Sequence, residues 1–257
     1  VGYDIIEYAP NKWHRSNADI IHIDTLPADI NKTYQPEVEV VGDITDSLDR
    51  IMHKAARLLE PNYALTVRKK MVAEHEQYRH DASFPMKPQK VLIDAREVMG
   101  PDDIVITDVG ANKVWAARHY NCYKPNTCII SNGFATMGLA VPGAIAANLV
   151  HPDRKVLAIT GDAGFMMNCQ EFETAHRLGS RFVTLIFNDR SYGLIKWKQE
   201  MHYGHPCYVD FTNPDFVKLA ESMGAVGYRI TKAEDLLPTL KKAFTLDKPV
   251  IIALVEK

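Results

Sequence analysis

The chain has 257 residues, of which 46% are hydrophobic and 24% are charged, as is typical of a globular protein with one large or two modest domains. Its formal net charge of −2 provides no electrostatic attraction for nucleic acid or for an anionic membrane surface. No apolar run approaches the roughly 20 residues of a membrane span, and the N-terminus shows no signal peptide. We therefore expect neither nucleic acid nor a membrane as a partner.

Cysteine and histidine patterns point away from a zinc protein or a disulfide-bonded protein. The four cysteines show neither a C-x-x-C pair nor the spacing of zinc ligands, and no H-E-x-x-H motif occurs among the ten histidines. Free thiols in a reducing compartment are the favoured interpretation. We therefore expect a cytoplasmic location.

Residues 1–60 contain too few predicted elements for a domain of their own. Apolar runs at 18–24 and 38–44 predict strands, and 46–59 has helical periodicity with Asp46 as its N-cap. Two strands and one helix cannot bury a sufficient core. We interpret this segment as the C-terminal remnant of a larger central α/β domain whose beginning is missing, an expectation that the absence of an initiator Met supports.

Residues 61–89 are predicted to form a helical linker. The stretch 63–80 is charged and helical in character, and Pro85 and Pro88 then mark a break in regular structure. A further helix is predicted over 90–99, where the last domain begins.

From residue 90 to residue 257, predicted strands and helices alternate regularly. This alternation predicts an α/β fold with a doubly wound, mostly parallel sheet and helices on both faces. Pro142 is expected to kink its helix. The predicted strands are 104–107, 127–130, 155–160, 182–187, 225–230 and 250–255, and the predicted helices are 112–119, 137–149, 166–178, 214–223 and 233–244.

Three of the predicted strands end in glycine-rich turns, at 107–112, 131–138 and 161–164. Ligands bind at the carboxyl ends of the strands in such a sheet, and glycine lets a ligand approach the backbone closely. A cofactor that lies along the sheet edge would use all three turns, although glycine after a strand is common in any α/β protein.

The turn that follows strand 155–160 combines glycine with an acidic residue. Asp162 would repel a bare phosphate, but a divalent cation between the carboxylate and the phosphate removes this conflict. Asn188 ends the next predicted strand, so the two side-chain oxygens converge if these strands are neighbours. Hard oxygen ligands of this kind predict a Mg²⁺ site. The alternative is an Asp in an ordinary strand–helix turn and an Asn in a loop.

These residues carry a resemblance to a known family. The pattern GDAGF…ND resembles the GDG…NN signature of thiamine diphosphate (ThDP) enzymes, and the surrounding chain resembles the large, catalytic subunit of the acetolactate synthase family. Ala163 and Asp189 replace the second Gly and the second Asn, at positions that vary in the family. The resemblance implies a ThDP diphosphate-binding fold and a Mg²⁺ ion bound by Asp162, Asn188 and a main-chain oxygen at Arg190.

The resemblance also implies how the cofactor is bound. Met137 corresponds to a bulky residue between the two rings of the V-shaped cofactor, for which a core methionine is the alternative. The carbonyl of Ala135 corresponds to the acceptor of its 4′-amino group, and Tyr192 corresponds to a position beside the diphosphate. The implied cofactor-binding residues are Gly110, Ala135, Thr136, Met137, Gly161, Ala163, Gly164, Tyr192, Gly193 and Leu194.

Two parts of the chain resemble different branches of the family. Trp197, which with Met137 is an implied catalytic residue, corresponds to a side chain of biosynthetic enzymes that favours 2-ketobutyrate over a second pyruvate. An exposed aromatic residue on an amphipathic helix is the alternative. Residues 2–8 (GYDIIEY) instead resemble catabolic enzymes that work without flavin. The two signals conflict, and we expect a catabolic-like enzyme without FAD.

The reaction implied by the resemblance uses small 2-oxo acids. ThDP and Mg²⁺ support decarboxylation of pyruvate, and hydroxyethyl-ThDP is then ligated to a second 2-oxo acid, giving acetolactate. The family's activating Glu comes from an N-terminal domain, across a dimer interface, and this chain contains no such domain. We therefore expect a homodimer or homotetramer, the N-terminal half of the same subunit as a partner, and little or no turnover by these 257 residues alone.

Two alternatives stay open. The general signature also fits another ThDP-dependent 2-oxo acid decarboxylase, carboligase or acyltransferase. The same strand–turn–helix unit also fits a non-catalytic α/β module that binds a phosphate or nucleotide.

Overall fold

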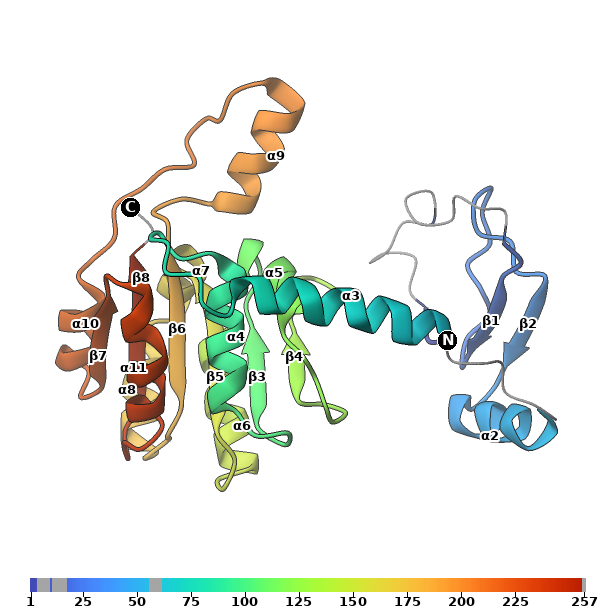
Figure 1. The fold of residues 1–257 in the computed structure, drawn as a ribbon, viewed down its shortest axis with the longest axis horizontal. Helices are drawn as coiled ribbons and strands as arrows, with labels where there is room; N and C mark the ends of the chain where they lie inside the picture. The colour runs from blue at the N-terminus through green and yellow to red at the C-terminus, as the bar shows by residue number, and fades with distance from the viewer. Residues whose placement is uncertain (4–9, 11–17, 56–61, 256–257) are drawn as a thin grey trace. The chain divides into compact units, whose positions relative to one another are not determined.

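The computed structural model describes residues 1–3, 10, 18–55 and 62–255. The chain forms two compact units, Val1–Thr66 and Val67–Lys257 (Figure 1). Their boundary falls inside the predicted linker, and the division into 1–60, 61–89 and 90–257 stays a prediction. Most of the GYDIIEY motif and the end of the predicted helix 46–59 lie outside the described residues.

The first unit contains two short parallel strands and a helix. β1 (Ile21–Asp24) pairs with β2 (Val38–Val41), and α2 (Ile44–Lys54) follows. The prediction of Asp46 as the helix N-cap is wrong, because Asp43 is the residue in extended conformation and its side chain accepts a hydrogen bond from the Asp46 N–H at 2.8 Å. Asp46 instead lies in the first helical turn, where its negative charge interacts favourably with the positive end of the helix dipole.

Two helices precede the large sheet. α3 (Asn62–Tyr78) confirms the predicted charged helix to within two residues. α4 (Pro88–Val98) confirms the next one, with Pro88 as its first residue rather than part of the linker. Proline is well suited to that position, because the first N–H of a helix has no partner within the helix.

The second unit is built on a six-stranded parallel sheet of order β4-β3-β5-β6-β8-β7. All six predicted strands are confirmed with shifts of one residue at most. The chain runs from β3 outward to β4 and then returns past β3 to β5, so the winding direction reverses between β3 and β5. Ligands bind at such a reversal in open α/β sheets. The strands are β3 (Ile104–Thr107), β4 (Cys128–Ile130), β5 (Val156–Gly161), β6 (Val183–Asn188), β7 (Val226–Ile230) and β8 (Val250–Val255).

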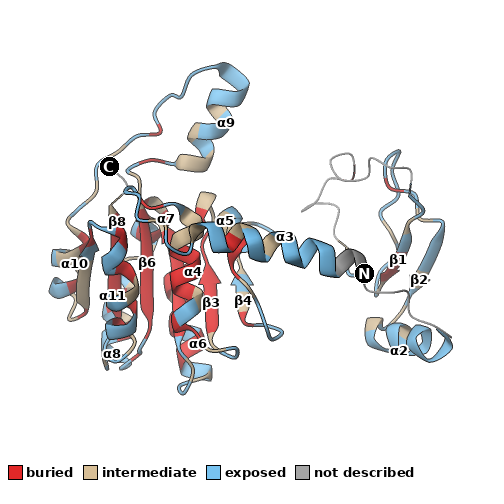
Figure 2. Ribbon diagram, viewed as in Figure 1, coloured by how far each residue is buried: buried red, intermediate tan, exposed pale blue. Residues whose placement is uncertain are grey.

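Helices cover both faces of this sheet, which confirms the predicted doubly wound α/β fold (Figure 2). Along β5, Leu157 and Ile159 belong to one apolar core and Val156 and Ala158 to the other. Strands buried on both faces are uniformly apolar, which is why these segments were recognisable. One core includes α4, α5 (Ala111–His119) and α11 (Leu236–Ala243), and the other includes α6 (Ala140–Val150), α8 (Glu171–Arg177) and α10 (Phe216–Ser222).

Two predicted helix starts are wrong, and the first of them concerns a residue that lines the cavity described below. The helix predicted over 137–149 begins at Ala140, so Met137 lies in the preceding loop. Pro142 falls in the first helical turn, where a missing N–H costs no hydrogen bond. Proline at this position therefore gives no reason for the kink that was expected. The helix predicted over 233–244 opens instead with a 3₁₀ turn at Ala233–Asp235.

The helix predicted over 166–178 is two helices. α7 (Asp162–Met167) and α8 are separated by a break at Asn168, whose φ of −137° is not helical. The apolar spacing continues across the break because Phe165 and Phe172 enter the same core, so periodicity alone did not reveal it. The Asn168 Nδ2 donates to the carbonyl of Gly138 at 2.8 Å. Among the described residues, no helix is long and apolar enough to cross a lipid bilayer.

Replacement of Phe172 by Ala tests the importance of this core. Phe172 is fully buried and its ring lies against those of Phe165 and Phe182. We expect Phe172→Ala to lower the free energy of unfolding by about 3–5 kcal/mol. The chemically identical change Phe134→Ala, at a fully exposed ring, should cost less than about 0.5 kcal/mol. Urea denaturation measures both, and equal costs would contradict this account of the core.

Candidate functional site

The glycine-rich strand ends meet at one edge of the large sheet. β3 and β5 pair through Thr107 and Ile159, and β5 and β6 pair through Gly161 and Phe187. The expectation that the strands before Asp162 and Asn188 are neighbours is therefore confirmed. A cavity of about 620 Å³, open to solvent, lies at these strand ends beside the reversal of winding.

Most of the residues predicted from sequence line this cavity. Unpredicted lining residues include Asn112, Trp115 and Phe187. Those predicted and found there are Gly110, Met137, Gly161, Asp162, Ala163, Gly164, Tyr192, Gly193 and Leu194.

Five predicted residues are not in the lining. Ala135 and Thr136 belong to the loop that presents Met137, and Asn188 and Arg190 lie next to lining residues of the β6 turn. Trp197 lies on α9 (Gly193–Tyr203) with 54% of its surface exposed. The catalytic roles of Met137 and Trp197 stay predictions.

The side chains of Asp162 and Asn188 converge on a single atom, the Nδ2 of Asn213. This amide donates to Asp162 Oδ2 at 2.6 Å and to Asn188 Oδ1 at 2.8 Å. An N–H donor between a carboxylate oxygen and an amide oxygen marks a place that also suits a small cation with oxygen ligands. A cation at that place and this pair of hydrogen bonds exclude each other, so Asn213 would have to turn or withdraw.

Asp162 is a buried carboxylate held by N–H donors. It is 1% exposed, and the main-chain N–H groups of Arg190 and Ala163 donate to it at 2.6 and 2.8 Å. Burial raises the pKa of Asp162 above its ordinary value, and hydrogen bonds from Asn213 and Arg190 partly offset this. Burial also raises the pKa of the nearby Asp189. The site therefore concentrates negative charge that a cation would stabilise.

The turn at Arg190 is conformationally strained. Arg190 has a φ of 58°, which is rare for a residue with a side chain. Its N–H faces Asp162, whereas its carbonyl accepts a hydrogen bond from the N–H of Phe211 at 3.0 Å. Strain of this kind persists where the surrounding structure holds the backbone in place. The second acceptor position of that carbonyl is available to a ligand.

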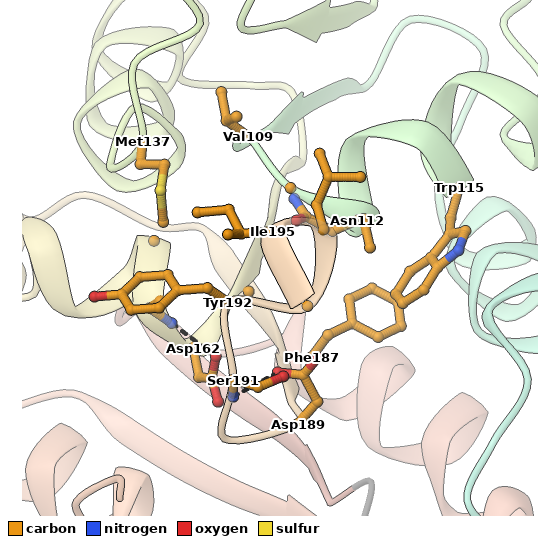
Figure 3. Close-up of a pocket in the computed structure, with 17 residues that line it drawn as sticks. Val109, Asn112, Trp115, Met137, Asp162, Phe187, Asp189, Ser191, Tyr192 and Ile195 are labelled. Carbon is orange, nitrogen blue, oxygen red and sulfur yellow. Dashed lines mark hydrogen bonds between the residues drawn. The ribbon is translucent and has the colours of Figure 1, made fainter. Parts of the chain in front are cut away.

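The other side of the cavity is apolar. Figure 3 shows the side chains of Met137 and Ile195 on one side of the cavity and the carboxylates of Asp162 and Asp189 on the other. The ring of Trp115 contacts that of Phe187, with centroids 5.1 Å apart. Apolar walls with a few converging polar groups are typical of cofactor sites.

Sequence reasoning missed two residues that organise this site. Asn213 lies in a loop before α10, and nothing in its spacing from Asp162 or Asn188 indicates that it bridges them. Asp108 lies within one of the glycine-rich turns, yet its burial and its hydrogen bonds to the Gly138 N–H at 2.9 and 3.0 Å depend on the tertiary structure. The signal in the sequence was an acidic residue directly after a predicted strand.

Gly164 is required by the carboxylate of Asp108. A Cβ at Gly164 would lie 2.9 Å from Thr160 Oγ1 and 3.1 Å from Asp108 Cγ, whereas a Cβ at Gly161 would meet only Asn112 Oδ1 at 3.8 Å. We therefore expect Gly164→Ala to lower the free energy of unfolding by about 1–3 kcal/mol and Gly161→Ala to change it much less. Thermal or urea denaturation compares the two variants, and an equal effect would refute the steric argument.

The comparison with protein families matches residues 108–254 to the thiamine pyrophosphate enzyme, C-terminal TPP binding domain. That range begins at Asp108 and includes every strand of the large sheet except β3.

Related proteins match nearly the whole chain. The acetolactate synthase of Bacillus subtilis is 36% identical over 98% of this chain and 45% of its own length. The catabolic acetolactate synthase of Raoultella terrigena is 32% identical over 99% of the chain and 46% of its own length. The acetolactate synthase large subunit of Corynebacterium glutamicum is 35% identical over 97% and 41%.

This chain spans about half the length of these relatives. The family match covers every residue that lines the cavity. The chain belongs to the ThDP-dependent acetolactate synthase family.

Proposed function

We propose that this chain supplies the ThDP- and Mg²⁺-binding part of an acetolactate synthase. The reaction is decarboxylation of pyruvate followed by carboligation to a second 2-oxo acid. The observation that carries the proposal is the convergence of Asp162 and Asn188 oxygens on one nitrogen atom, with Asp162 lining the cavity. The names of the related proteins support the reaction class.

The residues present fit a Mg²⁺ ion. In our proposal Asp162 and Asn188 provide two oxygen ligands, a main-chain oxygen at Arg190 provides a third, and diphosphate oxygens complete the set. The charge of the ion compensates the buried carboxylate, which has no cationic side-chain partner among the described residues. Asn213 gives up its two hydrogen bonds when the ion is bound.

The apolar half of the cavity fits the thiamine rings. When bound, ThDP supplies the carbanion chemistry, and the protein supplies shape and electrostatics. Met137, Leu194 and Ile195 exclude water from the reacting carbon, and the Ala135 carbonyl accepts a hydrogen bond from the aminopyrimidine. Trp197 borders the acceptor acid.

Other parts of the proposal concern the whole protein. In our proposal the activating Glu is supplied by the N-terminal half of a second copy of the subunit, so the active form is a homodimer or homotetramer. We also propose that the protein acts in the cytoplasm. FAD is not required. An acetolactate assay on the full-length protein tests the reaction, and formation of a different product from pyruvate would contradict it.

Asp162→Ala tests the metal site. We expect calorimetric titration of the chain to show ThDP binding that needs Mg²⁺, with affinity reduced about 100-fold or more in Asp162→Ala. Asp247→Ala is the matched control, because Asp247 is an exposed carboxylate paired with Arg181. ATP and NAD should not bind. Unchanged ThDP affinity in Asp162→Ala would refute the assignment.

The raised pKa of Asp162 predicts a pH dependence of metal binding. Protonation removes the charge that attracts Mg²⁺, so Mg²⁺ affinity should fall as the pH drops through a pKa above the ordinary carboxyl range of about 4. In the absence of Mg²⁺ the same group lowers stability as the pH rises through its pKa, because the folded state favours the protonated form. NMR titration of the Asp162 carboxyl carbon measures its pKa. Asp215, whose pKa is lowered, should be insensitive to Mg²⁺.

A further inference from the structure

A second buried carboxylate, Asp108, joins three segments of the cavity wall. It is 1% exposed. It accepts hydrogen bonds from the N–H of Gly138 at 2.9 and 3.0 Å and from the N–H of Ala140 at 3.3 Å. The hydroxyl of Thr160 donates to it at 3.3 Å. Asp108 thus fixes the start of α6 and the loop before it to the end of β5.

The negative charge of Asp108 is stabilised by N–H and O–H donors rather than by a cationic side chain among the described residues. The described part of the chain shows no Lys, Arg or His that forms an ion pair with Asp108, and the nearest further donor is the Val109 N–H at 2.7 Å. Burial of an unpaired carboxylate costs several kcal/mol unless N–H donors replace its water. Two of these donors, the N–H groups of Gly138 and Ala140, belong to the loop and to the start of α6, so the loop and the carboxylate stabilise each other.

The loop over 131–139 needs such an anchor, because its backbone is strained. Ala135 has a φ of 48°, in the left-handed region that residues with side chains avoid, whereas Gly138, with a φ of 90°, adopts its conformation without strain because it has no side chain. Such strain persists only when neighbouring groups hold the backbone. Other contacts of the loop include the hydrogen bonds that Asn168 Nδ2 donates to the Gly138 carbonyl and Lys113 Nζ donates to the Ser131 carbonyl, both at 2.8 Å.

We propose that Asp108 is a positioning residue that sets the thiamine end of the cofactor site. It holds the loop so that Met137 lines the cavity, and it thereby fixes the position of the Ala135 carbonyl two residues away. This inference rests on the proposed ThDP function and assigns a role to a residue that does not touch the cofactor. None of the hydrogen bonds of Asp108 involves Asp162, Asn188 or Asn213, although its carboxylate lies against Gly164 of α7. We therefore expect its loss to affect the thiamine end more than the diphosphate end.

Asp108→Asn tests the proposal, because the variant keeps the shape and replaces one acceptor oxygen by an N–H₂ group that faces N–H donors. Two ligands test the two ends of the site separately. ThDP with Mg²⁺ occupies both ends, whereas inorganic pyrophosphate with Mg²⁺ occupies the diphosphate end alone. We expect ThDP affinity to fall about 10-fold or more, because the loop of Met137 would no longer be held in position against the thiamine rings. Pyrophosphate affinity should change less than about 2-fold. Calorimetry measures both dissociation constants.

Asp94→Asn is the matched control, since Asp94 is also buried, at 2% exposure, but pairs with Lys90 on α4. It should leave both affinities unchanged. If Asp108→Asn weakens the two ligands equally, Asp108 is a general structural residue and the proposal fails. Unchanged affinity for both ligands also overturns it. If the parent chain binds neither ligand, the proposed function itself is wrong.

Thr160→Val keeps the proposal falsifiable if Asp108→Asn does not fold. Valine has the shape of threonine but removes the hydroxyl that supports Asp108 from β5. We expect a smaller loss of ThDP affinity, about 3-fold, with pyrophosphate affinity again unchanged. A loss that is equal for the two ligands, or no loss for either, would overturn the positioning role.

Discussion

Two buried carboxylates, neither of which has a cationic side-chain partner in the described part of the chain, lie at this edge of the sheet. Asp108 follows β3 and Asp162 follows β5, and each is 1% exposed. Both are held by main-chain N–H groups and by one polar side chain, Thr160 or Asn213. Because a buried charge is tolerated only when donors replace its water, each carboxylate fixes the backbone that surrounds it. The loops of the cavity depend on these contacts.

This arrangement explains where backbone strain occurs. Ala135 and Arg190 both have positive φ angles; one lies in the loop anchored by Asp108 and the other in the turn whose N–H meets Asp162. Each carboxylate thus organises one side of the cavity, with apolar side chains such as Met137 and Ile195 on one side and the carboxylates of Asp162 and Asp189 on the other (Figure 3). A cofactor with a ring system and a charged diphosphate requires this kind of division.

Local sequence signals predicted the presence of helices and strands better than the residues at which they begin and end. β8, with bounds Val250–Val255, was predicted without error, since strands buried on both faces are continuous apolar runs. The break between α7 and α8 was missed, because Phe165 and Phe172 keep helical spacing across it. Asn168 leaves the helix to bind the Gly138 carbonyl, and that partner is distant in the sequence.

The sequence by itself determined the fold class, the order of strands and helices along the chain, and the pairing of Asp162 with Asn188, because alternation of elements and strand-end motifs are local patterns. Only the tertiary structure decided that Asn213 bridges those two side chains and that Asp108 holds the loop of Met137. Both depend on hydrogen bonds between segments that are distant in the sequence, and their geometry is set by the register of the strands and the packing of the loops.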